Sequence, residues 1–143
     1  MANYQPVNVT ASTFTATRNG HSGAVITLNR AAGIAVTLPA ANGYGDVYRF
    51  YCGTTVTSNS TTVKVASSSD VMKGLALVAA DGGASVNGWE TAADTDTITW
   101  DGTTTGGVAG DYVELIDVAS GVWYVRVTGS ATGTEATPFS ATV

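Results

Sequence analysis

Apolar and polar residues alternate with a period of two along most of this chain, as expected for β-strands that bury one face. Ala24, Ile26 and Leu28 share one face of the segment 24–28, and the segment 34–38 repeats this arrangement. The pattern predicts about nine strands, over residues 24–28, 34–38, 47–52, 61–65, 72–78, 95–100, 112–118, 122–128 and 139–143. Their apolar faces predict a core that includes Ile26, Val36, Leu38, Phe50, Val113, Leu115, Trp123, Val125 and Val127.

Residues that favour turns separate these segments. Asn-Gly or Asp-Gly pairs stand at positions 19–20, 42–43, 81–82, 87–88 and 101–102, and Ser120-Gly121 separates two strong strand candidates. Helical spacing is not sustained, and the weak helical alternative over residues 71–80 is interrupted by Gly74. The sequence therefore predicts an all-β fold, as an antiparallel sandwich, a jelly-roll-like arrangement or a partly closed barrel.

The length of 143 residues suits a single domain, and no linker interrupts it. Residues 1–13 differ from the rest because they are polar and lack turn signals. They predict an N-terminal extended arm that precedes a single β domain over residues 14–143. A frayed terminus or a first edge strand is an equally good interpretation of the same residues.

Charge is scarce in this chain and is mostly negative. Charged residues make up 12% of the sequence, with a net charge of −5, whereas about 25% is usual in soluble domains. The two lysines and four arginines are never adjacent, which argues against a nucleic-acid partner because phosphate binding needs clustered cations. No apolar run reaches the roughly 18 residues of a membrane helix, so no membrane partner is predicted. The first residues lack the features of a secretion signal, which predicts synthesis in the cytoplasm.

Nucleophilic and metal chemistry find little support in the sequence. The single histidine, His21, lies in a glycine-rich segment and is expected to be an exposed turn residue. The single cysteine, Cys52, is expected to be a small buried hydrophobe. One histidine and one cysteine do not make a zinc site.

The densest acidic group is Asp94, Asp96 and Asp101, which are predicted to be solvated turn carboxylates. A calcium loop would need further ligands where Ile98 and Thr105 stand. No two carboxylates are singled out as an acid and base pair. The sequence therefore predicts no enzymatic activity, no cofactor and no metal.

Four segments resemble a group of small virion proteins of tailed bacteriophages: Val-Thr-Leu-Pro-Ala-Ala-Asn-Gly at 36–43, Thr-Thr-Val-Thr-Ser-Asn-Ser at 54–60, Ala-Ala-Asp-Thr-Asp-Thr-Ile at 92–98, and residues 129–139. The resemblance spans roughly residues 24–143 and is to head decoration, or cement, proteins. It implies a β-rich fold, homotrimers at quasi-threefold positions of a capsid, no enzymatic activity and no cofactor.

The expected function is that of a structural virion protein, which decorates and stabilises the outer surface of a bacteriophage capsid by binding between capsid subunits. Its expected partners are the major capsid protein and itself, and its place is the capsid surface after synthesis in the host cytoplasm. The alternative is a tail or fibre module that binds host surface glycans, for which Trp89 or tyrosine side chains would be exposed around a groove. The candidate partner-binding residues are Asn3, Tyr4, Gln5 and Pro6, and the candidate subunit-interface residues are Tyr48, Phe50 and Tyr51.

Overall fold

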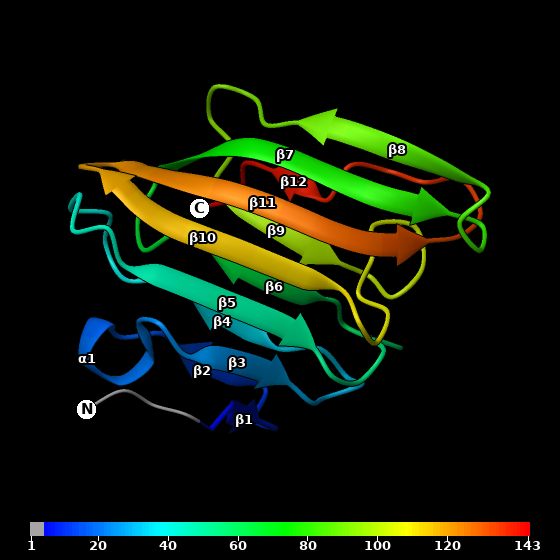
Figure 1. The fold of residues 1–143 in the computed structure, drawn as a ribbon, viewed down its shortest axis with the longest axis horizontal. Helices are drawn as coiled ribbons and strands as arrows, with labels where there is room; N and C mark the ends of the chain where they lie inside the picture. The colour runs from blue at the N-terminus through cyan, green and yellow to red at the C-terminus, as the bar shows by residue number, and fades with distance from the viewer. Residues whose placement is uncertain (1–4) are drawn as a thin grey trace.

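The computed structural model describes residues 5–143, which form a sandwich of two β-sheets with one short helix (Figure 1). The larger sheet has the strand order β1-β3-β5-β10-β11-β7-β8, and the smaller sheet has the order β12-β9-β6-β4-β2. The elements are β1 (Val7–Val9), β2 (Thr13–Thr15), α1 (Arg18–His21), β3 (Val25–Leu28), β4 (Ala35–Thr37), β5 (Val47–Cys52), β6 (Thr61–Lys64), β7 (Val71–Ala80), β8 (Ser85–Glu90), β9 (Thr97–Trp100), β10 (Tyr112–Ala119), β11 (Val122–Ala131) and β12 (Phe139–Ser140).

The prediction of an all-β fold is confirmed, and each of the nine predicted segments contains a strand. Residues 71–80, the weak helical alternative, form β7. The described part of the chain has twelve strands rather than about nine, because β1, β2 and β8 were not predicted. Two of these three have only three residues, and β8 contains an Asn-Gly pair that reads as a turn.

The sandwich is built from mixed sheets, not from antiparallel strands throughout. In the larger sheet, β3 pairs parallel with β1 and β5, and β7 pairs parallel with β11. In the smaller sheet, β4 pairs parallel with β2 and β6. Neither sheet closes into a barrel, because each ends in two edge strands. The jelly-roll connectivity stays a prediction.

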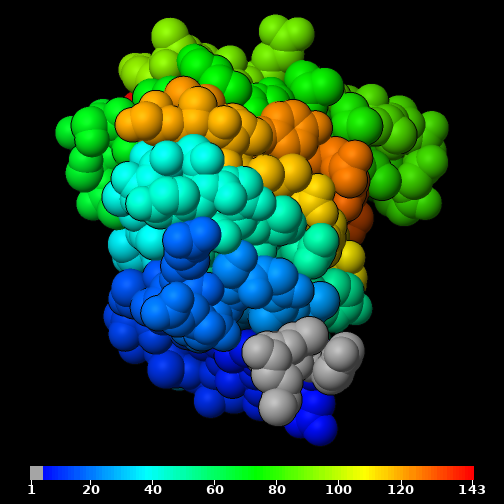
Figure 2. Space-filling view, turned by 60° about the vertical axis from the view of Figure 1, so that its left-hand side comes forward, coloured from blue at the N-terminus to red at the C-terminus, as the bar shows by residue number. Residues whose placement is uncertain are grey.

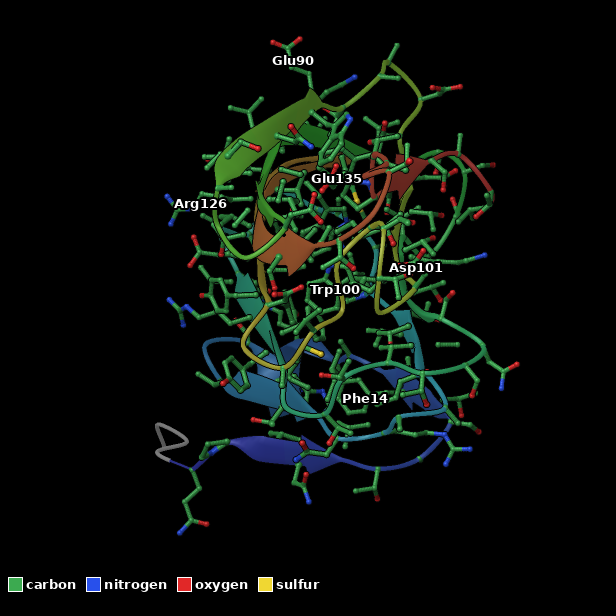
Figure 3. The ribbon with its side chains drawn as sticks, turned by 90° about the vertical axis from the view of Figure 1, so that its right-hand side faces the viewer. Phe14, Glu90, Trp100, Asp101, Arg126 and Glu135 are labelled. Carbon is green, nitrogen blue, oxygen red and sulfur yellow. The ribbon has the colours of Figure 1, made fainter. Side chains whose placement is uncertain are left out.

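The core lies between the two sheets, where the inward faces of both meet. All nine residues predicted to be in the core are buried. Trp100 of the smaller sheet and Trp123 of the larger sheet are the largest fully buried side chains, and Figure 3 shows Trp100 pointing into the space between the sheets. Burying a large apolar side chain is worth about 1.5–3 kcal/mol, so these inward faces hold the sandwich together.

The N-terminal segment joins the sandwich from residue 7 onward. Strand β1 pairs with β3 at the edge of the larger sheet, Val9 is buried, and the Asn29 amide donates to the Val9 carbonyl at 2.8 Å. The chain then crosses to the smaller sheet as β2. Residues 7–9 and residue 13 are therefore paired with the two sheets. The division into an arm over residues 1–13 and a domain over residues 14–143 stays a prediction. These N-terminal strands, in blue, lie at the opposite end of the molecule from β7 and β8, in green (Figure 2).

Helix α1 is a single turn that follows β2. The backbone amide of Thr17 donates to His21 Nδ1 at 2.9 Å, and the His21 ring meets the Phe14 ring edge-on with centroids 4.8 Å apart. His21 is therefore half-buried and closes this turn, although the sequence predicted an exposed histidine. Among residues 5–143, no helix has the length and apolar character needed to cross a bilayer.

Candidate functional site

The outward faces of the two sheets differ in chemistry. On the smaller sheet, the outward positions are mostly threonines: Thr13, Thr15, Thr37, Thr62 and Thr99. On the larger sheet, the outward positions hold seven of the nine large hydrophobic residues that are exposed in the described chain: Val25, Tyr51, Leu75, Leu77, Val86, Val118 and Tyr124. We call this surface of the larger sheet the outer face. Exposed apolar side chains gathered on one face of a soluble protein are typical of an interaction site.

A row of charged side chains crosses the middle of the outer face. Glu114 on β10 lies directly opposite Arg49 on β5 and Arg126 on β11. Its carboxylate is 3.3 Å from Arg49 Nε and 3.7 Å from Arg126 Nη2. The Tyr112 hydroxyl also donates to Glu114 at 3.3 Å. Burial, and then the Glu114 carboxylate, raise the pKa of Tyr112, so this hydroxyl stays a neutral donor.

The structure separates the three predicted interface residues. Along β5, Tyr48 and Phe50 point inward and are fully buried, whereas Tyr51 points outward and is 41% exposed. Tyr48 and Phe50 are therefore not available to a second subunit, because they fill the core of their own chain. The apolar run 47–52 has both faces apolar because one packs in the core and the other belongs to the outer face. Tyr51 is the one candidate that the structure leaves accessible.

The predicted partner-binding residues lie at the N-terminal end. Asn3 and Tyr4 are outside the described residues. Gln5 and Pro6 are exposed and come directly before β1, the edge strand next to β3.

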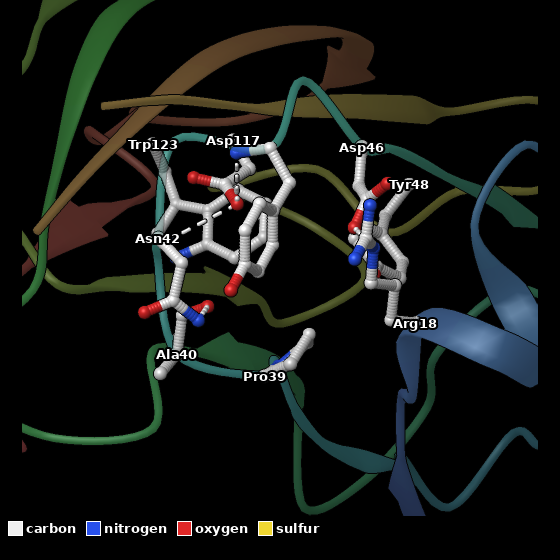
Figure 4. A pocket seen from close by; sticks show the side chains of 9 residues that line it. Arg18, Pro39, Ala40, Asn42, Asp46, Tyr48, Asp117 and Trp123 are labelled. Carbon is white, nitrogen blue, oxygen red and sulfur yellow. Dashed lines mark hydrogen bonds and ion pairs between the residues drawn. The ribbon is translucent and has the colours of Figure 1, made fainter. Parts of the chain in front are cut away.

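A small cavity of about 50 Å³ lies at one end of the sandwich (Figure 4). Tyr48 and Trp123 line it, and neither the tyrosine hydroxyl nor the indole N–H has a hydrogen-bond partner among residues 5–143. Burial raises the pKa of Tyr48 to about 12, with a further contribution from the Asp46 and Asp117 carboxylates. The cavity therefore presents two neutral hydrogen-bond donors, and its volume suits about one or two water molecules.

The carboxylates beside this cavity are already engaged. Asp117 accepts hydrogen bonds from three successive backbone amides, those of residues 42–44, at 2.6–3.1 Å. Asp46 forms an ion pair with Arg18 at 2.7 Å, and the Arg18 guanidinium lies 4.2 Å from the centre of the Tyr44 ring. These contacts fix the loop between β4 and β5. Neither of these two carboxylates is therefore free to activate a nucleophile in this cavity.

The three acidic residues of the calcium-like pattern have separate structural roles. Asp94 is exposed, whereas Asp96 is buried and accepts hydrogen bonds from the amides of Thr142 and Val143. The prediction that Asp96 is a solvated turn carboxylate is wrong, because it fastens the C-terminal segment to β9. Asp101 accepts hydrogen bonds within its own turn. Within residues 5–143, no group of three His, Cys, Asp or Glu side chains is placed to hold a metal.

The turn that begins at Asp101 predicts a pH effect on stability. Burial alone would raise the pKa of Asp101, but hydrogen bonds from Thr104, Thr105 and Thr103 lower it to about 2. A lowered carboxyl pKa stabilises the fold above the unfolded-state pKa, and that stability is lost as the pH falls from about 4 to about 2. The Asp101→Asn variant lacks this carboxyl group, so its free energy of unfolding should fall less between neutral pH and pH 3 than that of the unmodified protein. Urea unfolding of both proteins near neutral pH and near pH 3 measures this difference. An equal loss of stability in both proteins would contradict the lowered pKa of Asp101.

Two further side chains lack the exposure that a reactive or sugar-binding group needs. Cys52 is buried, and burial, with Asp111 adding to it, raises the pKa of its thiol to about 11. This thiol stays protonated and behaves as a core residue. Trp89 on β8 is half-buried and packs against the core. Of the side chains that the glycan-binding alternative offered, Trp89 is therefore not fully exposed, whereas Tyr44, Tyr51 and Tyr124 are exposed.

No protein family, curated protein or solved structure matches this chain. The outer face is accordingly the candidate site on its geometry and chemistry alone.

Proposed function

We propose that this chain is a structural virion protein that decorates and stabilises the outer surface of a bacteriophage capsid by binding between capsid subunits. The observation that carries the proposal is the contrast between the two sheets of one sandwich. The smaller sheet presents threonines to solvent, while the outer face presents apolar and tyrosine side chains. A sheet with no binding partner would be expected to carry polar residues on its outward side, as the smaller sheet does.

The composition of the outer face supports a protein partner. Protein interfaces are enriched in tyrosine and arginine and depleted in lysine. The outer face carries Tyr51, Tyr112 and Tyr124 around the pair Arg49 and Arg126, and Lys73 is its single lysine. Enzymatic activity and a cofactor are not part of this proposal.

The resemblance of residues 24–143 to decoration proteins supplies the identity of the partner within this proposal: the major capsid protein. The homotrimer that the same resemblance implies stays a prediction. A capsid surface is reached from the host cytoplasm at assembly, so no membrane or nucleic acid is involved in this binding. The partner-binding role of residues 3–6 also stays a prediction, beside that of the outer face.

A charge placed in the outer face tests the proposal. Tyr51 lies opposite Tyr112 and is 41% exposed, so Tyr51→Lys puts an ammonium into the predicted contact without disturbing the core. Its affinity for capsids that lack the protein is expected to fall by about tenfold or more, because an unpaired buried charge is costly. Co-sedimentation with such capsids measures this.

The matched control is Thr37→Lys, which adds the same charge to the exposed side of the smaller sheet. It should bind as the unmodified protein does. Equal binding by both variants would show that the outer face is not the contact. Electron microscopy of the particle then locates the protein, and density on the tail instead of the head would favour the tail or fibre module.

A further inference from the structure

Two opposite charges flank Leu75 on the outer face. In the register of the larger sheet, Arg126 on β11 lies opposite Leu75 on β7, which lies opposite Glu90 on β8. All three side chains are accessible: Leu75 is 48% exposed, the Arg126 side chain is 57% exposed and Glu90 is exposed. Figure 3 shows Arg126 projecting away from the sandwich and Glu90 at its end.

Neither of these charges is fully paired within the chain. Arg126 reaches only Glu114, at 3.7 Å, and Glu114 is already held more closely by Arg49 and Tyr112. Glu90 makes no ion pair or side-chain hydrogen bond with the rest of residues 5–143. The arrangement therefore offers one positive and one negative group, one strand spacing to either side of an exposed leucine.

We propose that a second copy of this chain packs on the β11–β7–β8 part of the outer face, about a twofold axis that runs parallel to β7 above Leu75. Rotation about this axis exchanges the two sides of Leu75. Arg126 then faces Glu90 of the partner subunit, Glu90 faces the partner's Arg126, and the two leucines meet at the axis. The surface is thus complementary to itself at these three positions, as an isologous interface requires. Lys73, also exposed on this side of β7, comes near its copy, but its ammonium is turned to the carbonyls of Ala92 and Ala93 at 3.1 and 2.9 Å.

The apolar residues around this row give the contact its driving force. Leu77 on β7 and Val86 on β8 are 49% and 65% exposed, and both lie on the same side of the sheet as Leu75. Packing two sheets face to face removes such side chains from water, while the charge pairs fix orientation and register more than affinity. Tyr51 lies three strands from β7, so the contact leaves that part of the outer face open. The pairing of copies therefore goes beyond capsid binding and does not depend on it.

Charge exchange tests the twofold contact on the purified protein. Arg126→Glu places two negative groups against each other at both ends of the interface, and Glu90→Arg places two positive groups there. Each single variant is expected to raise the dimer dissociation constant by about tenfold or more. An equimolar mixture of the two variants should dimerise as the unmodified protein does, because every introduced charge then faces its opposite. The variant that carries both exchanges should also dimerise, because its two charges are only swapped. Sedimentation velocity measures the unmodified protein, the two single variants, their mixture and this double variant.

The control is Thr37→Glu, which changes the charge of the smaller sheet and should leave the dimer unchanged. Unchanged urea unfolding of the single variants, measured under monomeric conditions, shows that a lost dimer is not a lost fold. A monomer at every concentration would overturn the proposal, and so would a dimer insensitive to the exchanges. A mass of three subunits would overturn the twofold geometry in favour of the trimer that the sequence resemblance implies.

Discussion

Replacing Gly74 by alanine is expected to destabilise the fold by about 3 kcal/mol or more, the upper end of what overpacking costs. Gly74 lies in β7 opposite Val125 of β11, and a Cβ at this position would overlap the Val125 carbonyl. The obstacle is backbone, so no side-chain rotation relieves it. The strands would have to separate where they form ten parallel residue pairs.

Gly88→Ala is the matched control for this prediction. Gly88 also lies in the larger sheet, in β8, but its Cβ would meet the Leu77 side chain at 3.6 Å and the Ala76 carbonyl oxygen at 3.9 Å, both ordinary contacts. Its effect on stability should stay within about 0.5 kcal/mol. Urea unfolding followed by far-UV circular dichroism compares the two variants. Equal stability of both would mean that β7 and β11 are not packed as closely as the structure has them.

The period-two pattern was sufficient to predict the strands that bury one face in the core. Ile26, Val36 and Leu115 belong to three different strands, and each is buried as expected. The direction of pairing was not predictable in this way, because parallel and antiparallel strands alternate their side chains with the same period. The parallel pairing of β7 with β11 is set by the path of the chain between them.

Residue pairs that favour turns did not always mark the end of a strand. Ser120-Gly121 does connect β10 and β11, and Gly121 has a φ of 77°, which glycine adopts without strain. Asn87-Gly88, in contrast, lies inside β8 and pairs with β7. Glycine at an edge strand interrupts nothing when a longer neighbour supplies the hydrogen bonds.

The candidate site was only partly visible in the sequence. The apolar run 47–52 predicted a strand whose two faces are both covered. Which of these faces packs in the core could not be read from the sequence, and for this reason Tyr48 and Phe50 were assigned to an interface. The outer face combines residues from six strands, and strand order decides which of them are neighbours. The buried carboxylate of Asp117 was also missed, because its backbone partners, residues 42–44, lie more than 70 residues away.

Leu115→Ala is expected to lower the free energy of unfolding by about 2–5 kcal/mol, the usual cost of a cavity at a fully buried leucine. Leu115 is 0% exposed and lies in the middle of the larger sheet, between Tyr48 of β5 and Val125 of β11. These neighbours are held in strands on both sides, so they cannot move inward to fill the space. The loss should therefore fall in the upper part of this range.

The neighbouring Ile116→Ala removes a similar amount of hydrocarbon from the opposite side of the same strand. Ile116 is half-buried on the outer face, so its removal leaves a site that water can fill and should cost only about 1 kcal/mol. Urea unfolding with an unchanged m-value gives both free energies. If the two variants lost equal stability, the inward face of β10 would not be the packed centre of the sandwich.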